Sequence, residues 1–98
     1  MIFPYKIQRS IDKHIEKEVR KNICREDFNL ITYFHRKNNP KDGERRNYHN
    51  AMSRIYSQKA NMYTKFKDWK NYHTFLNLSI EEGKQTINYS LQIWQEAY

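Results

Sequence analysis

The sequence has very few residues that break a helix, because it contains only two prolines and two glycines among 98 residues. These four residues are Pro4, Pro40, Gly43 and Gly83. The two long stretches between them carry apolar residues at spacings of three and four, which is the periodicity of a helix and not of a strand. So few glycines also exclude the glycine-rich loops that bind phosphate in P-loop and dinucleotide-binding proteins. The sequence therefore predicts an all-α fold.

Cysteine and long apolar runs are also scarce. Cys24 is the only cysteine, so no intramolecular disulfide can form and a reducing compartment is favoured. Residues 1–6 lack a charged region followed by an apolar run, and no apolar stretch approaches the ~18 residues of a membrane span. We therefore expect a cytoplasmic protein without a cleaved signal or a transmembrane segment.

The breakers and the apolar spacing predict a small bundle of three main helices within one domain, residues 1–98, in which residues 1–5 form an arm. The first helix covers 5–37, although an interruption at residues 24–27 allows two shorter helices instead. A turn at 38–43 leads to a second helix from Glu44, and a third begins at Trp69 with Asp68 as its N-cap. Gly83 either lies within the third helix or ends it before a fourth helix at Lys84.

A core follows from the same periodicity, with the third helix packed on both others. The predicted core residues are Ile11, Ile15, Val19, Met52, Ile55, Tyr63, Phe66, Tyr72, Leu76, Ile80, Ile87 and Leu91. Cys24 follows Ile23 near the apolar face, so we expect a buried structural thiol there.

Part of this predicted hairpin resembles a tetratricopeptide-type helical hairpin. Four residues fall where such repeats place their signature residues: Tyr56, Ala60, Tyr63 and Leu76. The segment departs from the pattern at Tyr72, where the repeat has a small residue, and at Lys59, where it has an apolar one. The resemblance covers about one repeat and implies an antiparallel helix pair, since a single repeat does not form a stable solenoid.

The charge is strongly positive and unevenly distributed. The formal net charge is +7 and the pI is about 9.6. Residues 1–46 hold twelve Lys or Arg against seven Asp or Glu, and residues 47–70 hold five against one, whereas residues 71–98 hold one against three. The first two thirds of the chain are therefore expected to attract an acidic partner, such as nucleic acid or an acidic protein surface.

Two groups of cations are candidates for nucleic-acid contact. The first is a line on the predicted first helix, opposite its isoleucines: Lys6, Arg9, Lys13, Lys17 and Arg20. The second gathers around the predicted turn: Arg36, Lys37, Arg45, Arg46, His49 and Arg54. Tyr48 and His49 are candidates for stacking on bases. The alternative for the first group is an ordinary solvated helix face.

No arrangement of residues in the sequence indicates catalysis, a cofactor or a metal. None of the four histidines has a ligand-type partner three or four residues away together with the usual second pair of ligands, and Cys24 has no neighbouring cysteine. The sequence therefore predicts a non-enzymatic regulatory or accessory protein, of the kind found on bacterial mobile elements or phages, that binds nucleic acid. The alternative is a protein-interaction module, for self-association or for inhibition of a larger protein, that uses the aromatic residues Trp69, Tyr89, Trp94 and Tyr98.

Overall fold

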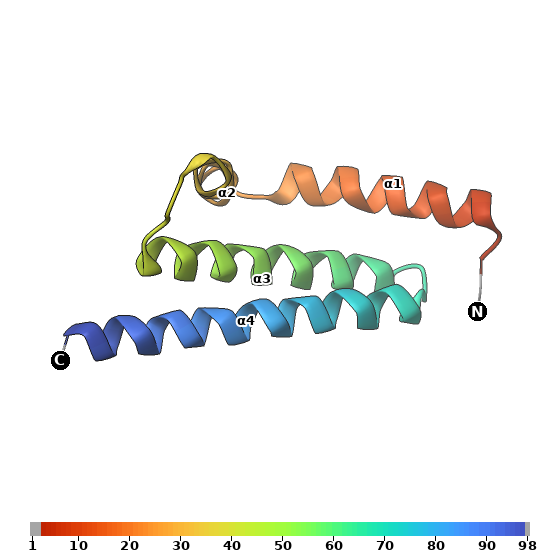
Figure 1. The fold of residues 1–98 in the computed structure, drawn as a ribbon. Helices are drawn as coiled ribbons and strands as arrows, with labels where there is room; N and C mark the ends of the chain where they lie inside the picture. The colour runs from red at the N-terminus through yellow and green to blue at the C-terminus, as the bar shows by residue number, and fades with distance from the viewer. Residues whose placement is uncertain (1–2, 98) are drawn as a thin grey trace.

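The computed structural model describes residues 3–97, which form four α-helices and no strand (Figure 1). The helices are α1 (Tyr5–Asn22), α2 (Arg25–Arg36), α3 (Asp42–Thr64) and α4 (Trp69–Ala97). The prediction of an all-helical chain is confirmed. The prediction of three main helices is wrong by one, because the segment predicted as one helix over 5–37 is divided.

The break between α1 and α2 lies at Ile23 and Cys24, which both have extended backbone angles. Cys24 is the N-cap of α2, and its Sγ accepts a hydrogen bond from the backbone N–H of Asp27 at 3.4 Å. The alternative of two shorter helices is therefore correct. The prediction of a buried thiol at Cys24 is wrong, since this side chain turns back over the first turn of α2 and is exposed.

Two residues with positive φ stand in the connections. Asn39, in the turn before α3, has φ 54°, a conformation that asparagine tolerates better than most residues. Because α3 begins at Asp42, two residues earlier than predicted, Gly43 lies inside its first turn and not in the loop. Lys67, with φ 55°, reverses the chain between α3 and α4. The connection between α2 and α3 is thus shorter than the turn over 38–43 that was predicted to include Gly43.

Asp68 starts α4 as predicted. Its carboxylate accepts hydrogen bonds from the backbone N–H of Asn71 at 3.3 Å and from the Asn71 side chain at 2.8 Å. From Trp69 the helix continues through Gly83, so the alternative of a separate fourth helix at Lys84 is wrong. An ideal Cβ at Gly83 would meet only Ser53 Oγ, at 3.8 Å, which means that α3 and α4 pass close together here without excluding a methyl group.

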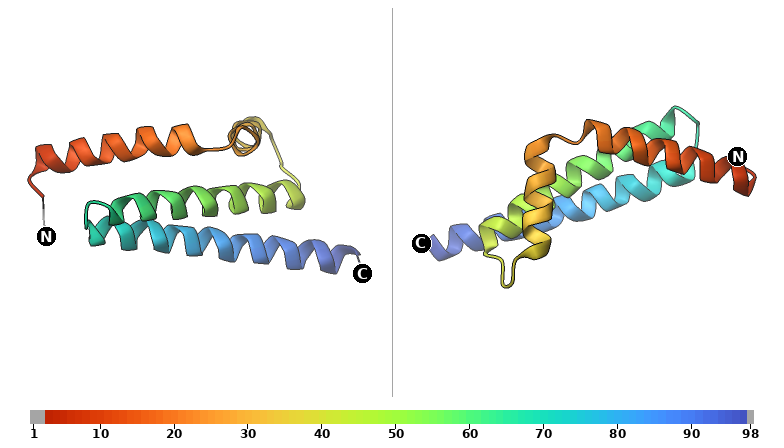
Figure 2. Two further views of the ribbon diagram at one scale, coloured as in Figure 1. Left: turned by 180° about the vertical axis from the view of Figure 1, so that it is seen from behind. Right: turned by 90° about the horizontal axis from the view of Figure 1, so that it is seen from above.

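The helices are arranged around α3. Helix α4 runs antiparallel to α3 along the whole length of α3. Helix α1 lies along the other side of α3, and α2 crosses α3 at a steep angle (Figures 1 and 2). The molecule is elongated, with extents of 53 × 22 × 19 Å. Helix α4 has 29 residues and α3 has 23, so α4 extends roughly 9 Å beyond the start of α3 at 1.5 Å per residue.

The core is small and lies where α1 faces α3. Its buried members are Ile11, Ile15, Val19 and Tyr63, all of which were predicted. The partly buried residues packed on it are Phe3, Ile23, Ile55, Met62, Phe66, Tyr72 and Phe75. Helix α4 therefore reaches this core only through Tyr72 and Phe75 in its first two turns. The prediction that the third helix packs on both others holds for α3 but is wrong for the first helix, because no backbone contact joins α4 to α1 or α2 among the described residues.

Three residues predicted in the core are exposed instead. Ile80, Ile87 and Leu91 are 49%, 60% and 54% exposed. Small residues form the closest part of the contact between α3 and α4, where Ala51, Ala60 and Ser79 are buried, and ring pairs such as Tyr63–Phe75 and His49–Tyr89 add to it. Each of Ser53 and Ser79 donates its hydroxyl to the other's backbone carbonyl oxygen, at 3.0 and 2.8 Å. The large aliphatic residues on the flank of α4 lie beside this contact and stay about half exposed.

A polar network joins α1 to the turn between α3 and α4. The Gln8 amide donates to Asp12 Oδ1 and to Asp68 Oδ2, both at 2.9 Å, and the Tyr63 hydroxyl donates to Asp12 at 2.7 Å. Burial and the neighbouring Asp12 carboxylate both raise the pKa of Tyr63. Burial alone would raise the pKa of Asp68, which is 4% exposed, but the hydrogen bonds from Asn71 and Gln8 lower it.

We expect this network to make the protein sensitive to acid. Because the folded-state pKa of Asp68 lies below its ordinary value of 3.8, the unfolded chain takes up the proton first as pH falls. This stabilisation is complete above about pH 5 and is lost as pH falls through the folded-state pKa. Replacing Asp68→Asn keeps a good N-cap but loses the charge, at a cost of about 1–2 kcal/mol at pH 7. Urea unfolding between pH 7 and 3 should show a smaller acid loss in Asp68→Asn than in the wild type; equal losses would contradict this role.

The continuity of α4 through Gly83 gives a second expectation. Gly83→Ala should raise the free energy of unfolding by about 0.5–1 kcal/mol, because alanine restricts the unfolded chain and its methyl group meets only an ordinary van der Waals contact. Thermal and urea unfolding measure the change. Destabilisation by Gly83→Ala would show that α3 and α4 approach more closely than described.

Candidate nucleic-acid interface

The outer face of α1 carries a line of exposed cations. Lys6, Arg9, Lys13, Lys17 and Arg20 are all exposed, and they lie opposite the buried face formed by Ile11, Ile15 and Val19. We call these five residues the α1 basic face. From Lys6 to Arg20 the face is roughly 21 Å long at 1.5 Å per residue. The predicted line opposite the isoleucines is thus present on the folded surface, although Ile7 itself is 49% exposed.

The α1 basic face is little neutralised by its neighbours. Arg20 pairs with Glu16 at 3.4 Å, and the two side chains are 77% and 58% exposed. An ion pair that is so open to water contributes little, and it breaks readily when a stronger anion is offered. Helix α3 lies behind α1, so the basic face points away from the rest of the molecule (Figure 2). An extended polyanion therefore has unobstructed access to it.

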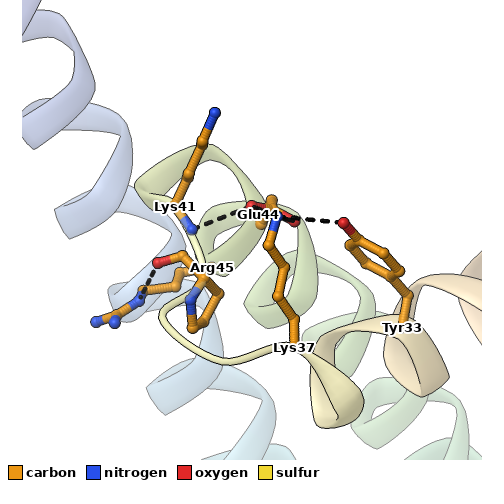
Figure 3. Close-up of polar contacts among 6 residues, drawn as sticks. Tyr33, Lys37, Lys41, Glu44 and Arg45 are labelled. Carbon is orange, nitrogen blue, oxygen red and sulfur yellow. Dashed lines mark hydrogen bonds and ion pairs between the residues drawn. The ribbon is translucent and has the colours of Figure 1, made fainter.

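The second predicted group, around the turn, is largely used inside the molecule. Lys37 Nζ donates to both carboxylate oxygens of Glu44, at 2.8 and 2.9 Å, and to the Tyr33 hydroxyl at 3.2 Å (Figure 3). This pairing raises the pKa of Lys37 and lowers the pKa of Glu44. Arg45 Nε donates to the Pro40 carbonyl oxygen at 3.1 Å. Lys37 and Arg45 therefore stabilise the start of α3. A ligand could bind them only by breaking these contacts.

Two more members of this group join separate helices. Arg54 on α3 donates to both carboxylate oxygens of Asp27 on α2, at 2.6 and 3.2 Å. The hydrogen bond from Arg54 lowers the pKa of Asp27. His49 Nδ1 contacts a carboxylate oxygen of Glu82 on α4. Arg54 therefore connects α3 to α2, and His49 connects α3 to α4.

Arg36 and Arg46 are the two members of the second group for which the described residues show no contact with another helix or with the turn before α3. Arg36 is exposed at the end of α2. Arg46 is half-buried, and its guanidinium donates only to the neighbouring Asn47 side chain, at 3.3 Å. The structure thus gives Lys37, Arg45, His49 and Arg54 separate partners, and it leaves two of the six residues as a supplement to the α1 basic face.

The rings predicted to stack on bases are already stacked within the molecule. Tyr48 lies on Phe34, with ring centroids 4.0 Å apart and an interplanar angle of 11°. His49 lies on Tyr89 at 5.6 Å and 4°, and the Arg45 guanidinium lies 5.9 Å from the same Tyr89 ring. Burial raises the pKa of Tyr48, as expected for a ring that is part of the packing. These rings offer no platform of the kind that single-stranded nucleic acid uses.

The predicted aromatic interface is divided. Trp69 and Trp94 are 52% and 62% exposed, at opposite ends of α4. Tyr89 is half-buried in its stack with His49, and Tyr98 lies outside the described residues. Sequence reasoning missed that Ile87 and Leu91 share the exposed flank with Trp94. Their regular spacing with Trp94 gave a signal for one common face, but not for whether the chain covers that face.

Two further structural features of residues 3–97 and the comparisons with known proteins bear on function. No group of three His, Cys, Asp or Glu side chains converges as a metal site would require. No helix combines the length and the apolar character needed to cross a bilayer. Comparisons of the chain with known protein families, curated proteins and solved structures found no match. The α3–α4 pair has the antiparallel arrangement implied by the tetratricopeptide resemblance, and no family assignment accompanies it.

The contrast between Arg54 and Arg46 can be tested directly. Arg54→Ala should lower the free energy of unfolding by about 1 kcal/mol, because it leaves the largely buried Asp27 carboxylate without its partner, while the half-exposed guanidinium is partly screened by solvent. Arg46→Ala should change it by less than about 0.5 kcal/mol. Urea unfolding measures both variants, and equal effects would argue against a structural role for Arg54.

Proposed function

We propose that this protein is a small, non-enzymatic nucleic-acid-binding protein that contacts the phosphate backbone through the α1 basic face. The observation that carries the proposal is the exposure of five cations along one helix, on the side opposite the core, where the ion pair that the described residues show is the open one between Arg20 and Glu16. Phosphate contacts from Lys and Arg provide most of the sequence-independent affinity for nucleic acid. Arg36 and Arg46 supply secondary contacts.

The kind of nucleic acid follows from what the surface offers. The α1 basic face presents ammonium and guanidinium groups in a line and no stacked aromatic platform, which suits a regular duplex backbone better than splayed single-stranded bases. Binding is therefore proposed to be independent of sequence. A regulatory or accessory role in the cytoplasm, of the kind that mobile elements or phages encode, is the setting we propose, supported by the lone cysteine and the basic charge.

The exposed flank of α4 favours a second candidate function, which is protein binding. It presents Ile87, Leu91 and Trp94 within two and a half turns, each more than half exposed. Clusters of exposed apolar residues that include tryptophan are typical of protein interfaces. The two candidates differ in salt dependence, because apolar contacts respond little to ionic strength whereas phosphate contacts weaken steeply.

Charge reversal on α1 tests the leading proposal. We expect Lys13→Glu with Lys17→Glu to weaken binding to a mixed-sequence DNA duplex at least ~10-fold, measured by fluorescence anisotropy at about 50 mM salt. In the wild type, five phosphate contacts would give a slope of log affinity against log salt of about −4.5, and the double variant should lose about two units of that slope.

Two matched controls make this result specific. Lys13→Arg with Lys17→Arg keeps the charge and should bind as the wild type does. Lys65→Glu with Lys70→Glu removes the same charge from exposed positions outside α1 and should weaken binding far less. The proposal is wrong if the wild type shows no salt-dependent binding to duplex DNA or RNA, or if the α1 variant and the Lys65/Lys70 variant lose equal affinity.

A further inference from the structure

The exposed flank of α4 forms a continuous strip. Its members are Ile80, Lys84, Ile87, Leu91 and Trp94, which recur at spacings of four, three, four and three and so share one face of the helix. The four apolar members are 49%, 60%, 54% and 62% exposed, in chain order. We call these five residues the α4 strip. Ile87, Leu91 and Trp94, with Ser90, border a shallow depression that is wide open to solvent.

In the part of the chain that the structure describes, the four apolar members of the α4 strip stay about half exposed or more. Helix α3 occupies the neighbouring face of α4, where Ser79 and Gly83 approach Ser53. Helix α1 lies on the far side of α3, and the last turns of α4 extend beyond α3 (Figures 1 and 2). The strip therefore faces solvent along more than half of α4, at the end of the molecule farthest from the core.

We propose that the α4 strip is the interface of a homodimer in which the α4 helices of two copies pack antiparallel. This inference rests on the second candidate function and commits it to one partner. The spacing from Lys84 through Ile87 and Leu91 to Trp94 is three, four, three, which reads the same in both directions. A two-fold axis near residue 89 thus places Ile87 opposite Leu91 of the second copy, and Lys84 opposite its Trp94.

These cross-pairs are chemically complementary. Ile87 against Leu91 buries two branched aliphatic side chains, as in the seam of an antiparallel helix pair. Lys84 is 63% exposed and pairs only weakly with Glu81, at 3.2 Å. Its aliphatic stem can cover apolar surface while its ammonium lies over the indole ring of the opposite Trp94. The single charge in the strip therefore has a partner in this register.

The strip supplies about half of the area per partner that a standard interface buries, and it would form the apolar centre of the dimer interface. Its four apolar side chains expose roughly 400 Å² together, taking roughly 150 Å² for the tryptophan and the remainder for the aliphatics. Because somewhat more than half of an ordinary interface is non-polar, an interface centred on the strip would bury roughly 700 Å² per copy. A stable interface of standard size buries about 800 Å² per partner.

The charge distribution favours this face over others for self-association. Residues 71–97 carry Lys84 against three glutamates, so two copies of α4 meet with little net charge. The α1 basic face lies on the opposite side of α3, and repulsion between the strongly positive segments is thereby kept away from the interface (Figure 1).

Sedimentation equilibrium on nuclease-treated protein tests the proposal. We expect the wild type to be dimeric at tens of micromolar, and Leu91→Glu to raise the dissociation constant at least ~30-fold by placing a carboxylate in the apolar seam. The matched control is Gln92→Glu, which adds the same charge at the next residue, off the strip, and should leave the dimer intact. Circular dichroism confirms that each variant remains helical. A wild type that stays monomeric at ~100 µM, or a dimer that Leu91→Glu leaves intact, overturns the proposal.

Disulfide trapping tests the antiparallel register. In a Cys24→Ser background, chains carrying Ile87→Cys are mixed with an equal amount of chains carrying Leu91→Cys and oxidised. The proposed axis places these positions opposite each other, so the mixed disulfide should form faster than either homodisulfide. Faster homodisulfides would overturn the antiparallel arrangement.

Binding to DNA separates this inference from the leading proposal. Leu91→Glu monomers should retain the salt slope per chain that the α1 basic face gives, and Lys13→Glu with Lys17→Glu should remain dimeric.

Discussion

The structure depends on α3 being the one helix against which the others pack. Helices α1, α2 and α4 each contact α3, and α1 and α4 approach each other only near Asp68. One helix has a limited circumference, and three partners leave little of it exposed. Its partners, in contrast, each bury one face and expose the rest. The exposed surfaces that carry the functional proposals, the α1 basic face and the α4 strip, are direct consequences of this arrangement.

Two kinds of contact hold the partners on α3. Helix α1 is attached by a small apolar core in which Ile15 is fully buried, and its start is tied to Asp68 through Gln8. Helix α4 is attached by close backbone approach along Ser53, Ser79 and Gly83, where side chains are small and hydroxyls satisfy carbonyl oxygens. Because small residues bring helices together without filling space around them, α4 keeps its large aliphatic residues on its flank.

The charges divide in a similar way. Lys37, His49 and Arg54 each contact an acidic residue at a helix end or on a facing helix. These residues, which were predicted to bind a ligand, therefore connect elements of the fold instead. Helix α1 has no facing helix on its outer side, so its cations remain available. A dimer formed through α4 would place two α1 basic faces on the outside of the assembly, and each could contact a separate stretch of duplex. The leading proposal and the further inference are therefore compatible, and each stands without the other.

The sequence by itself determined that the chain is helical and that α4 starts after Asp68, whereas it left the break near Cys24 and the role of Gly83 open. The scarcity of glycine and proline, the periodicity of Ile11, Ile15 and Val19, and the capping chemistry of Asp68 are local properties, and local physics is sufficient to read them. Only the tertiary structure decided whether an apolar or charged side chain meets another element. Periodicity shows that Ile87 and Leu91 share a face with each other, but coverage of that face depends on where α3 lies. Likewise, Arg54 pairs with Asp27 and is not available to a ligand because of the way α2 crosses α3. Residue spacing along the chain does not encode this long-range geometry.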